Sequence, residues 1–326
     1  MNDHRSGTYG TSEQYPNING YEVIRLLGKG GFGEVYLCKR DIVDATSTMY
    51  NTVGATSTMY FAVKRVIGSI GIQEFDLFID EIRNLYMVSL MPYTVRYIDS
   101  FTESHGKIFR FFDIIKEGYD YWRSSIFESL SNETLDDRNT NNYIVTSYAP
   151  GVNIEKCYLP KDDVNRILRE LIYAVLQYHE CGIIHRDLKG DNILYDESNQ
   201  TFTIIDFGIV KLPDHNLRDP RAGTHEYMPP EEREERATLH SNSTLFVLDP
   251  GTYDYKKRDS YSLGVVFYKI MNKRSPFEGD VNLYEPKLNP IPSDTGNILL
   301  DTMIDKLITP IPENRIYLWE ALNYLQ

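Results

Sequence analysis

The sequence predicts an α+β protein with two lobes, a small β-rich amino-terminal lobe with one main helix and a larger, mostly helical carboxy-terminal lobe. Short runs rich in β-branched and aromatic residues dominate as far as residue 148. After residue 151, apolar residues recur instead at helical spacing. Residues 147–151, which contain Pro150 and Gly151, separate the two patterns and indicate a connection. We therefore expect one lobe at residues 21–148 and the other at residues 149–326.

The amino-terminal lobe follows a polar segment. Residues 1–20 are rich in glycine, serine and asparagine, and we expect them to form a disordered tail. The runs expected to form strands are residues 21–27, 34–39, 60–66, 94–101 and 143–148. Residues 73–90 are expected to form the main helix, because apolar side chains follow helical spacing there: Phe75, Phe78, Ile82, Leu85 and Val88.

The last strand of this lobe has two candidates, residues 107–115 and residues 143–148. Both runs contain enough β-forming residues for a strand. We favour residues 143–148, because only that run leads directly into the connection.

Three segments, at about residues 41–58, 116–142 and 232–258, look inserted into this plan. The first contains a tandem decapeptide repeat, since residues 44–53 and 54–63 both carry Ala-Thr-Ser-Thr-Met-Tyr. An even repeat length keeps the same side chains on each face of a strand if the register slips. We predict an exposed hairpin extension there, with a cluster of phosphorylation sites as the alternative. The other two are expected to be loops, with docking surfaces as the alternative.

The carboxy-terminal lobe opens with the clearest helical pattern of the chain. Its apolar stripe consists of Val164, Ile167, Leu168, Leu171, Ile172, Val175 and Leu176. Gly182 is the expected end of this helix, because glycine readily adopts the left-handed conformation that ends helices.

The charge and cysteine content exclude several classes of protein. A net charge of −13, from 34 basic and 47 acidic residues, disfavours nucleic acid and anionic membrane surfaces as partners. The three cysteines are scattered and form no C-x-x-C pair, which argues against a disulfide framework or a structural zinc site. No apolar run is long enough for a membrane span or a signal peptide. We expect a cytoplasmic protein, with the nucleus as the alternative location.

The most informative residues are 185–192, His-Arg-Asp-Leu-Lys-Gly-Asp-Asn, together with the later triplet Asp206-Phe207-Gly208. Phosphoryl transfer requires a carboxylate that orients the attacking hydroxyl and a cation that balances the charge of the moving group. Asp187 and Lys189 supply these two groups. Asn192 and Asp206 supply oxygen ligands of the kind that Mg²⁺ prefers.

A glycine-rich segment at residues 28–35, Gly-Lys-Gly-Gly-Phe-Gly-Glu-Val, lies between two expected strands. Glycines allow backbone amides to approach phosphate oxygens closely. The G-x-G-x-x-G pattern also occurs at dinucleotide sites, but there it opens a helix, whereas here a strand follows. Lys64 then appears on the next expected strand, within Ala62-Val63-Lys64.

These motifs, with the late Asp259 and the Pro-Glu-Asn-Arg run that ends at Arg315, resemble the protein-kinase superfamily from residue 21 to residue 326. The resemblance implies a bilobal kinase fold that uses Mg²⁺ and ATP. Asp187 then corresponds to the base that orients the substrate hydroxyl, and Lys189 to the cation that steadies the γ-phosphoryl group. Asn192 and Asp206 correspond to the Mg²⁺ ligands.

The resemblance also implies an ATP site. Lys64 would hold the α- and β-phosphates with Glu81 as its partner, and Glu74 and Asp80 compete for that role. Thr146 would be a small gatekeeper beside the adenine. The residues expected around the nucleotide are Gly28, Gly30, Gly31, Gly33, Val35, Ala62, Lys64, Thr146, Ser147, Tyr148 and, near the ribose, Asn153.

On the acceptor side, Lys189 and residues 223–231 resemble serine/threonine kinases rather than tyrosine kinases. Thr224 is expected to form hydrogen bonds near Asp187 and Lys189. Ile209, directly after Asp-Phe-Gly, resembles the residue of kinases that favour threonine. The partners implied are ATP and a protein substrate with a serine or threonine acceptor.

Three further expectations concern supporting residues. Glu231 and Arg315 should form a buried ion pair, and His185 should be a buried scaffold residue beneath Phe207. Residues 209–223 contain no serine, threonine or tyrosine, so we expect activity without phosphorylation of that loop, with Asp214 and Asp219 available as anions.

The sequence therefore predicts an active serine/threonine protein kinase. A kinase-fold pseudoenzyme that binds nucleotide as a scaffold is the main alternative, disfavoured because Lys64, Asp187, Asn192 and Asp206 are all present. A small-molecule kinase is the third reading, disfavoured by the peptide-docking signature at residues 223–231.

Overall fold

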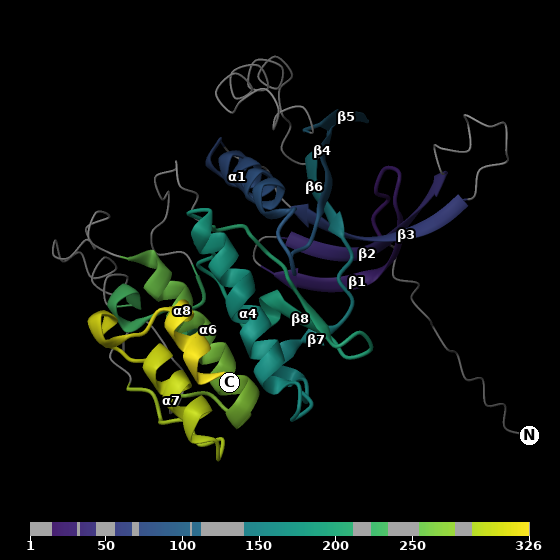
Figure 1. Ribbon diagram of the computed structural model, residues 1–326. Coiled ribbons are helices and arrows are strands. Elements are labelled where there is room, and N and C mark those ends of the chain that lie inside the picture. Colours follow the sequence, from purple (N-terminus) through teal and green to yellow (C-terminus); the bar gives the residue numbers. More distant parts are fainter. Residues whose placement is uncertain are drawn as a thin grey trace, which may run out of the picture. The chain divides into compact units, whose positions relative to one another are not determined.

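The computed structural model describes residues 15–30, 33–43, 56–66, 72–104, 106–111, 140–210, 223–233, 254–277 and 289–325. The chain divides into two compact units (Figure 1). One unit combines Met1–Ser69 with Ile98–Tyr148, and the other combines Ile70–Tyr97 with Ala149–Gln326. The division after Tyr148 coincides with the connection expected from the sequence. The segment Ile70–Tyr97, which the sequence places in the first lobe, belongs instead to the second unit.

The first unit is built on a six-stranded sheet with the strand order β1-β2-β3-β6-β4-β5. Its strands are β1 (Glu22–Gly30), β2 (Gly33–Val43), β3 (Thr56–Val66), β4 (Tyr97–Ser104), β5 (Lys107–Arg110) and β6 (Thr140–Ser147). The first three strands form an antiparallel meander, and β6 pairs antiparallel with β3. A strand is therefore present at each of the five predicted runs, but the bounds differ: β4 begins at residue 97 rather than 94, β6 ends at residue 147 rather than 148, and most strands extend by several residues at one end.

The choice between the two candidates for the last strand is confirmed. β6 ends at Ser147, directly before the connection, and lies inside the sheet beside β3. Its central residues Tyr143, Ile144 and Val145 are all buried. In its described residues, 107–111, the rival run forms β5, a four-residue strand at the sheet edge.

The bounds of the three expected insertions need correction. Residues 41–43 and 56–58 belong to β2 and β3, where Thr58 Oγ1 donates a hydrogen bond to Asp41 Oδ1 (2.6 Å). Residues 140–142 belong to β6, and residues 232–233 and 255–258 are helical. Paired strands satisfy backbone hydrogen bonds, so the flanking elements extend into the polar segments. The remaining residues, 44–55, 116–139 and 234–253, lie outside the described part of the chain.

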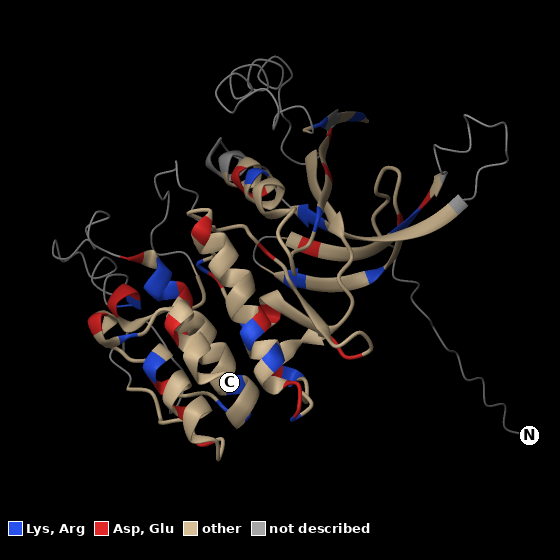
Figure 2. Cartoon of the chain, viewed as in Figure 1, with Lys and Arg blue, Asp and Glu red and all other residues tan. Residues whose placement is uncertain are grey.

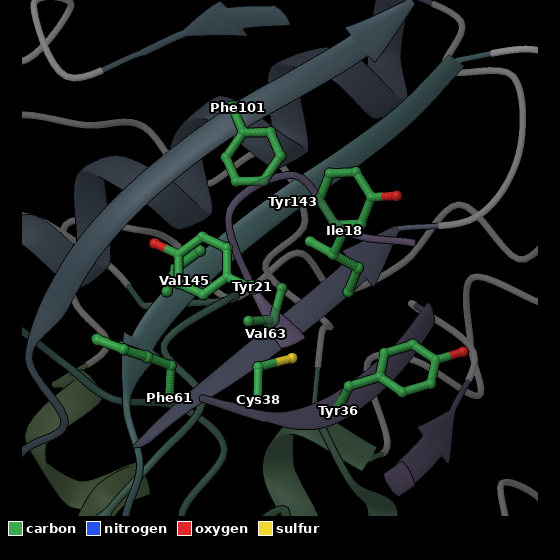
Figure 3. Close-up of a cluster of buried hydrophobic side chains, with 9 residues drawn as sticks. All are labelled: Ile18, Tyr21, Tyr36, Cys38, Phe61, Val63, Phe101, Tyr143 and Val145. Atoms are coloured by element: carbon green, nitrogen blue, oxygen red, sulfur yellow. The ribbon is translucent and has the colours of Figure 1, made fainter. Parts of the chain in front are cut away.

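The core of the first unit is a cluster of buried side chains, shown in Figure 3: Ile18, Tyr21, Tyr36, Cys38, Phe61, Val63, Phe101, Tyr143 and Val145. The Tyr21 ring meets the Phe61 ring edge-on, with centroids 5.4 Å apart. Ile18 is 1% exposed and its carbonyl accepts a hydrogen bond from Tyr21 N (3.0 Å). The prediction of a disordered tail over residues 1–20 is therefore wrong at its end, because burial of the Ile18 side chain in this apolar cluster stabilises an ordered conformation. Residues 1–14 lie outside the described residues.

The second unit holds the helices α1 (Ile72–Val88), α4 (Val164–Glu180), α6 (Tyr255–Asn272), α7 (Ile298–Leu307) and the four-residue α8 (Leu318–Ala321). A small sheet has the strand order β7-β8-β9, with strands β7 (Val152–Asn153), β8 (Ile193–Asp196) and β9 (Thr201–Ile204). Short 3-10 turns are η3 (Ile154–Lys156), η4 (Gly190–Asn192), η5 (His225–Tyr227), η6 (Pro312–Asn314) and η7 (Leu322–Tyr324). Within the described residues, no helix is both long and apolar enough to cross a bilayer.

Helix α4 follows the predicted pattern closely. Six of the seven residues of its predicted stripe are buried, and Leu176 is half-buried. The chain leaves the helix through Gly182, which has φ +72° as expected for a helix-terminating glycine.

Helix α1 belongs to the second unit because of its contacts there. Asn84, which is buried, donates from Nδ2 to the carbonyl of Phe207 (2.9 Å). Beyond the helix, Val95 N donates to the carbonyl of Ile204 (3.2 Å). Four members of its predicted stripe, Phe78, Ile82, Leu85 and Val88, are buried, and the side chain of Phe75 lies outside the described residues. The apolar pattern thus predicted the buried face but not the unit to which the helix belongs.

Candidate active site

The β8–β9 hairpin brings the two halves of the predicted catalytic motif together. Ile193 pairs with Ile204 across the hairpin, and Ile205 N donates to the carbonyl of Asn192 (2.8 Å). Asn192 precedes β8 and Asp206 follows β9, so both lie at the same end of the hairpin. Residues distant in sequence therefore converge, as the motif predicts.

Asp187 lies at the centre of a dense hydrogen-bond cluster. Its Oδ2 accepts from Lys189 Nζ (2.7 Å) and Asn192 Nδ2 (3.0 Å). Its Oδ1 accepts from the backbone N (3.1 Å) and Oγ1 (2.9 Å) of Thr224. Burial alone would raise the pKa of Asp187, but the bond and charge of Lys189 outweigh it and hold the pKa below the ordinary value. The carboxylate is therefore ionised and fixed in one orientation at neutral pH.

Lys189 connects the catalytic loop to the segment at residues 223–231. Its Nζ donates to Thr224 Oγ1 (2.9 Å) as well as to Asp187. The prediction that Thr224 bonds beside these two residues is confirmed. Because Asp187, Lys189 and Thr224 bond to one another, the carboxylate of Asp187 is held against residues 223–231, which we call the acceptor segment.

Helix α6 fixes the backbone of the catalytic loop through Asp259. Its Oδ2 accepts from His185 N and its Oδ1 from Arg186 N, both at 2.9 Å. His179 Nε2 lies 2.9 Å from the same carboxylate, which is fully buried. Burial would raise the pKa of Asp259, but the hydrogen bonds and His179 lower it, so the group stays charged.

His185 is a scaffold residue, as predicted. It is fully buried, and its ring centroid lies 4.9 Å from that of Phe207. Burial lowers its pKa, so the imidazole is neutral at physiological pH. It packs beneath Phe207 rather than serving as a proton shuttle.

Asn192 and Asp206 carry the expected metal-ligand oxygens. Asn192 Nδ2 donates to the carbonyl of Asp187 (2.9 Å) and to its carboxylate, so the amide oxygen is the atom left for a cation. Asp206 is exposed and has φ +65°, an uncommon conformation for a residue with a side chain. An amide oxygen beside a carboxylate suits Mg²⁺, which takes few protein ligands and completes its shell with phosphate and water.

Glu81 on α1 approaches the same segment. A side chain added at Gly208 would lie 3.7 Å from Glu81 Oε2 and 3.4 Å from Asp206 Oδ1. Asp80 and Glu74 were the other candidates for the partner of Lys64. Asp80 directly precedes Glu81 in the helix, and the side chain of Glu74 lies outside the described residues. Pairing of Lys64 with Glu81 joins residues of different units and stays a prediction.

The glycine-rich segment forms the turn between β1 and β2, where Gly28 pairs with Val35 and Gly30 with Gly33. A Cβ at Gly33 would lie 2.1 Å from the carbonyl oxygen of Arg65, and φ is +131°, so the fold itself requires glycine there. At Gly28 and Gly30, no described atom lies within 4 Å of an added Cβ. Glycine at these two positions therefore fits close approach by a ligand. Gly31 lies outside the described residues.

The other expected nucleotide residues of the first unit are neighbours across three strands. Lys64 on β3 pairs with Val35 on β2, and Ala62 pairs with Thr146 on β6. Because residues two apart share a face, Ala62 and Lys64 lie on one side of the sheet. The chain continues through Ser147, which pairs with Phe61, to Tyr148, whose N donates to the carbonyl of Tyr60 (3.3 Å). The sheet thus brings these residues close together, and their contact with a nucleotide stays a prediction.

Asn153 lies in the second unit, in β7. Its Oδ1 accepts from Glu155 N (2.8 Å), and its Nδ2 donates to Asp191 Oδ1 (2.7 Å). These bonds place it beside the catalytic loop, and its expected ribose contact stays a prediction.

The predicted pair of Glu231 and Arg315 is confirmed. Arg315 Nη1 and Nη2 donate to the two oxygens of Glu231 at 2.7 and 3.0 Å. Arg315 also donates to the carbonyls of Thr309, Pro310 and Lys257. The end of the acceptor segment is therefore anchored to the carboxy-terminal helices. The loop at residues 211–222, with Asp214 and Asp219, lies outside the described residues.

Sequence analysis missed a network around Glu155. This carboxylate accepts from Gly190 N (3.1 Å) and from Tyr227 OH (2.9 and 3.0 Å), and lies 3.2 Å from Lys269 Nζ. A Cβ at Gly190 would lie 2.4 Å from Glu155 Cδ, so this glycine makes room for the network. Burial raises the pKa of Glu155, which Lys269 opposes. No spacing pattern in the sequence connects these residues. The one sequence signal was Gly190, since a glycine within residues 185–192 indicates that another group packs closely against the backbone there.

Comparison with known proteins decides the family. The chain matches the family described as "Protein kinase domain" over residues 21–316. The chain belongs to the protein kinase family. The expected superfamily, its bilobal α+β fold and ATP-dependent serine/threonine kinase activity are thereby confirmed.

The curated relatives bear the corresponding names. Serine/threonine-protein kinase ppk34 of Schizosaccharomyces pombe is 25% identical over 95% of this kinase and 84% of the relative. CBL-interacting serine/threonine-protein kinase 5 of Arabidopsis thaliana is 36% identical over 40% of this kinase and 27% of the relative. Ribosomal protein S6 kinase alpha-6 of Danio rerio is 25% identical over 79% of this kinase and 27% of the relative. The chain thus spans most of the first relative and about a quarter of the other two.

Proposed function

We propose that this kinase transfers the γ-phosphoryl group of Mg·ATP to protein hydroxyls and prefers threonine to serine. The observation that carries this proposal is the cluster in which Asp187 binds Lys189, Asn192 and Thr224. An ionised carboxylate held by a lysine and a neighbouring hydroxyl suits the orientation of an incoming alcohol.

On the nucleotide side, the glycine-rich turn and Lys64 bind the phosphates, and Glu81 holds Lys64 in place. Val35, Ala62, Thr146, Ser147 and Tyr148 surround the adenine, and Asn153 binds the ribose. Asn192 and Asp206 hold Mg²⁺, which when bound neutralises charge on the transferred phosphoryl group. Support comes from the register of β2, β3 and β6 and from the open space at Gly28 and Gly30.

On the acceptor side, Asp187 accepts the hydrogen bond of the substrate hydroxyl and takes its proton as the oxygen bonds to the γ-phosphorus and the bond from that phosphorus to the leaving ADP breaks. Lys189 stabilises the negative charge of the transferred group. Thr224 holds Asp187 in the orientation that this requires.

The preference for threonine follows from Ile209. Its carbonyl accepts a hydrogen bond from Arg186 Nη1 (3.2 Å), so its backbone is attached to the residue before Asp187. A β-branched side chain there offers an apolar surface to the extra methyl group of threonine.

We also propose a cytoplasmic location and a protein substrate rather than nucleic acid or membrane. On α4, basic and acidic residues lie in close succession along the ribbon (Figure 2), and Arg166 pairs with Asp163 and Glu170 at 3.1 Å. With the net charge of −13, this arrangement gives polyanions little attraction.

The experiment uses two peptides that differ only in a serine or threonine acceptor, with radiolabelled ATP and either Mg²⁺ or EDTA. We expect transfer with Mg²⁺ only, and a larger kcat/KM for the threonine peptide. Equal or faster serine phosphorylation would refute the preference, and undiminished transfer in EDTA would refute the metal role. ATP binding without transfer to any acceptor would favour the pseudoenzyme alternative.

A further inference from the structure

The residue directly before the catalytic aspartate is held from both sides. Arg186 has φ +70°, a conformation that costs energy for a residue with a side chain. Its N–H donates to Asp259 Oδ1 (2.9 Å), and its carbonyl accepts from Arg258 Nη2 (2.8 Å). Two consecutive residues of α6 therefore fix both peptide groups of Arg186.

Arg258 is a buried cation that forms an ion pair with Glu232. Its Nη1 lies 2.5 Å from Glu232 Oε2, and the two side chains are 1% and 2% exposed. A charge this deeply buried is tolerated only when it is paired and hydrogen-bonded. Arg258 therefore uses one nitrogen for Glu232 and the other for the carbonyl of Arg186.

The same guanidinium also packs against the start of the acceptor segment. A Cβ at Gly223 would lie 2.4 Å from Arg258 Nη2 and 3.1 Å from the carbonyl oxygen of Arg186. Gly223 has φ +135°, and it directly precedes Thr224, which bonds to Asp187. Arg258 thus lies against the two residues that directly precede Asp187 and Thr224, namely Arg186 and Gly223.

We propose that Arg258 and Glu232 are positioning residues for phosphoryl transfer. The carbonyl of Arg186 belongs to the planar peptide group that joins it to Asp187, so the bond from Arg258 sets the direction in which Asp187 leaves the backbone. Glu232, which follows Glu231 in the chain, holds Arg258 in place through the ion pair. This inference rests on the proposed function, since it assigns the pair to the same reaction.

A small displacement of a catalytic group lowers the rate of the chemical step strongly. Loss of the bond from Arg258 should therefore lower kcat, because Asp187 no longer faces the hydroxyl correctly. The KM for ATP should not change, because neither residue is among the proposed nucleotide ligands. A purely structural ion pair would show no such split once the protein is folded.

The test separates positioning from stability by replacing both partners at once. Exchange of a buried ion pair for apolar residues of similar volume is often neutral or stabilising. In the double variant Glu232→Leu with Arg258→Met, we expect a melting temperature close to that of the parent protein. We expect kcat for the peptide to fall about tenfold or more, the effect of one lost charge-assisted hydrogen bond, with KM for ATP unchanged within about twofold.

Arg258→Lys is the second variant, for use whether or not the double variant folds. Lysine keeps the charge beside Glu232, but its compact ammonium cannot reproduce the fork that reaches both partners. We expect a folded protein with reduced kcat and unchanged KM for ATP. Arg166→Gln, at a half-exposed pair on α4 away from the catalytic loop, is the matched control and should keep full activity.

A parental kcat in either folded variant overturns the proposal. Absence of transfer by the parent protein itself would instead refute the proposed function, and Asp187→Asn supplies the background rate for that comparison. The two failures are therefore distinguishable.

Discussion

Replacing Asp187 by asparagine is expected to lower kcat by about 10²–10⁴-fold, the usual contribution of a general base. Asparagine has nearly the same shape, so Thr224 keeps an acceptor for one of its bonds. Its amide cannot take a proton, and it removes the charge that Lys189 faces at 2.7 Å. Transfer rates at saturating ATP and peptide give kcat, and calorimetry gives the dissociation constant for ATP.

The test depends on a fall in kcat without a matching change in the affinity for ATP. The dissociation constant for ATP should stay within about threefold of the parent value, because Asp187 is not a proposed nucleotide ligand. Circular dichroism should show an unchanged fold. A variant that retains most of its kcat would show that another group orients the hydroxyl.

Replacing Arg315 by alanine is expected to destabilise the protein by about 3–5 kcal/mol, the range for breaking a buried ion pair on one side. The change leaves Glu231 without its bidentate partner and removes the hydrogen bonds from Arg315 to the carbonyls of Thr309, Pro310 and Lys257. Urea unfolding followed by circular dichroism measures the loss.

Arg166→Ala is the matched control for this stability effect. Arg166 also binds two carboxylates, Asp163 and Glu170, but it is 38% exposed, whereas Arg315 is fully buried. We expect the control to lose no more than about 1 kcal/mol. Similar losses in both variants would mean that burial of the Arg315 pair does not set its contribution.

The catalytic cluster was predictable because its residues form short local motifs. Asp187, Lys189 and Asn192 lie within one loop, and their chemistry restricts the roles open to them. The β8–β9 hairpin needs only its turn to bring Asp206 to the same end. The pair of Glu231 and Arg315 was predictable only through the family resemblance, because 84 positions separate the two residues.

The supporting residues were not predictable in the same way. Glu232 and Arg258 look like ordinary surface charges in the sequence, and only the fold of the acceptor segment against α6 buries them. Glu155 and Lys269 meet for the same reason. The apolar stripe of α1 gave its buried face, but its unit depends on Asn84, a polar residue that no hydrophobic pattern includes.

The central claim is the proposed Mg·ATP site, and an acyl phosphate derivative of ATP tests it most directly. Such a reagent acylates amines beside its terminal phosphates, and mass spectrometry identifies the modified lysines. The account predicts Mg²⁺-dependent acylation of Lys64 from the first unit and Lys189 from the second, with excess ATP protecting both. Acylation that omits one of these two lysines, or that excess ATP does not reduce, would contradict it.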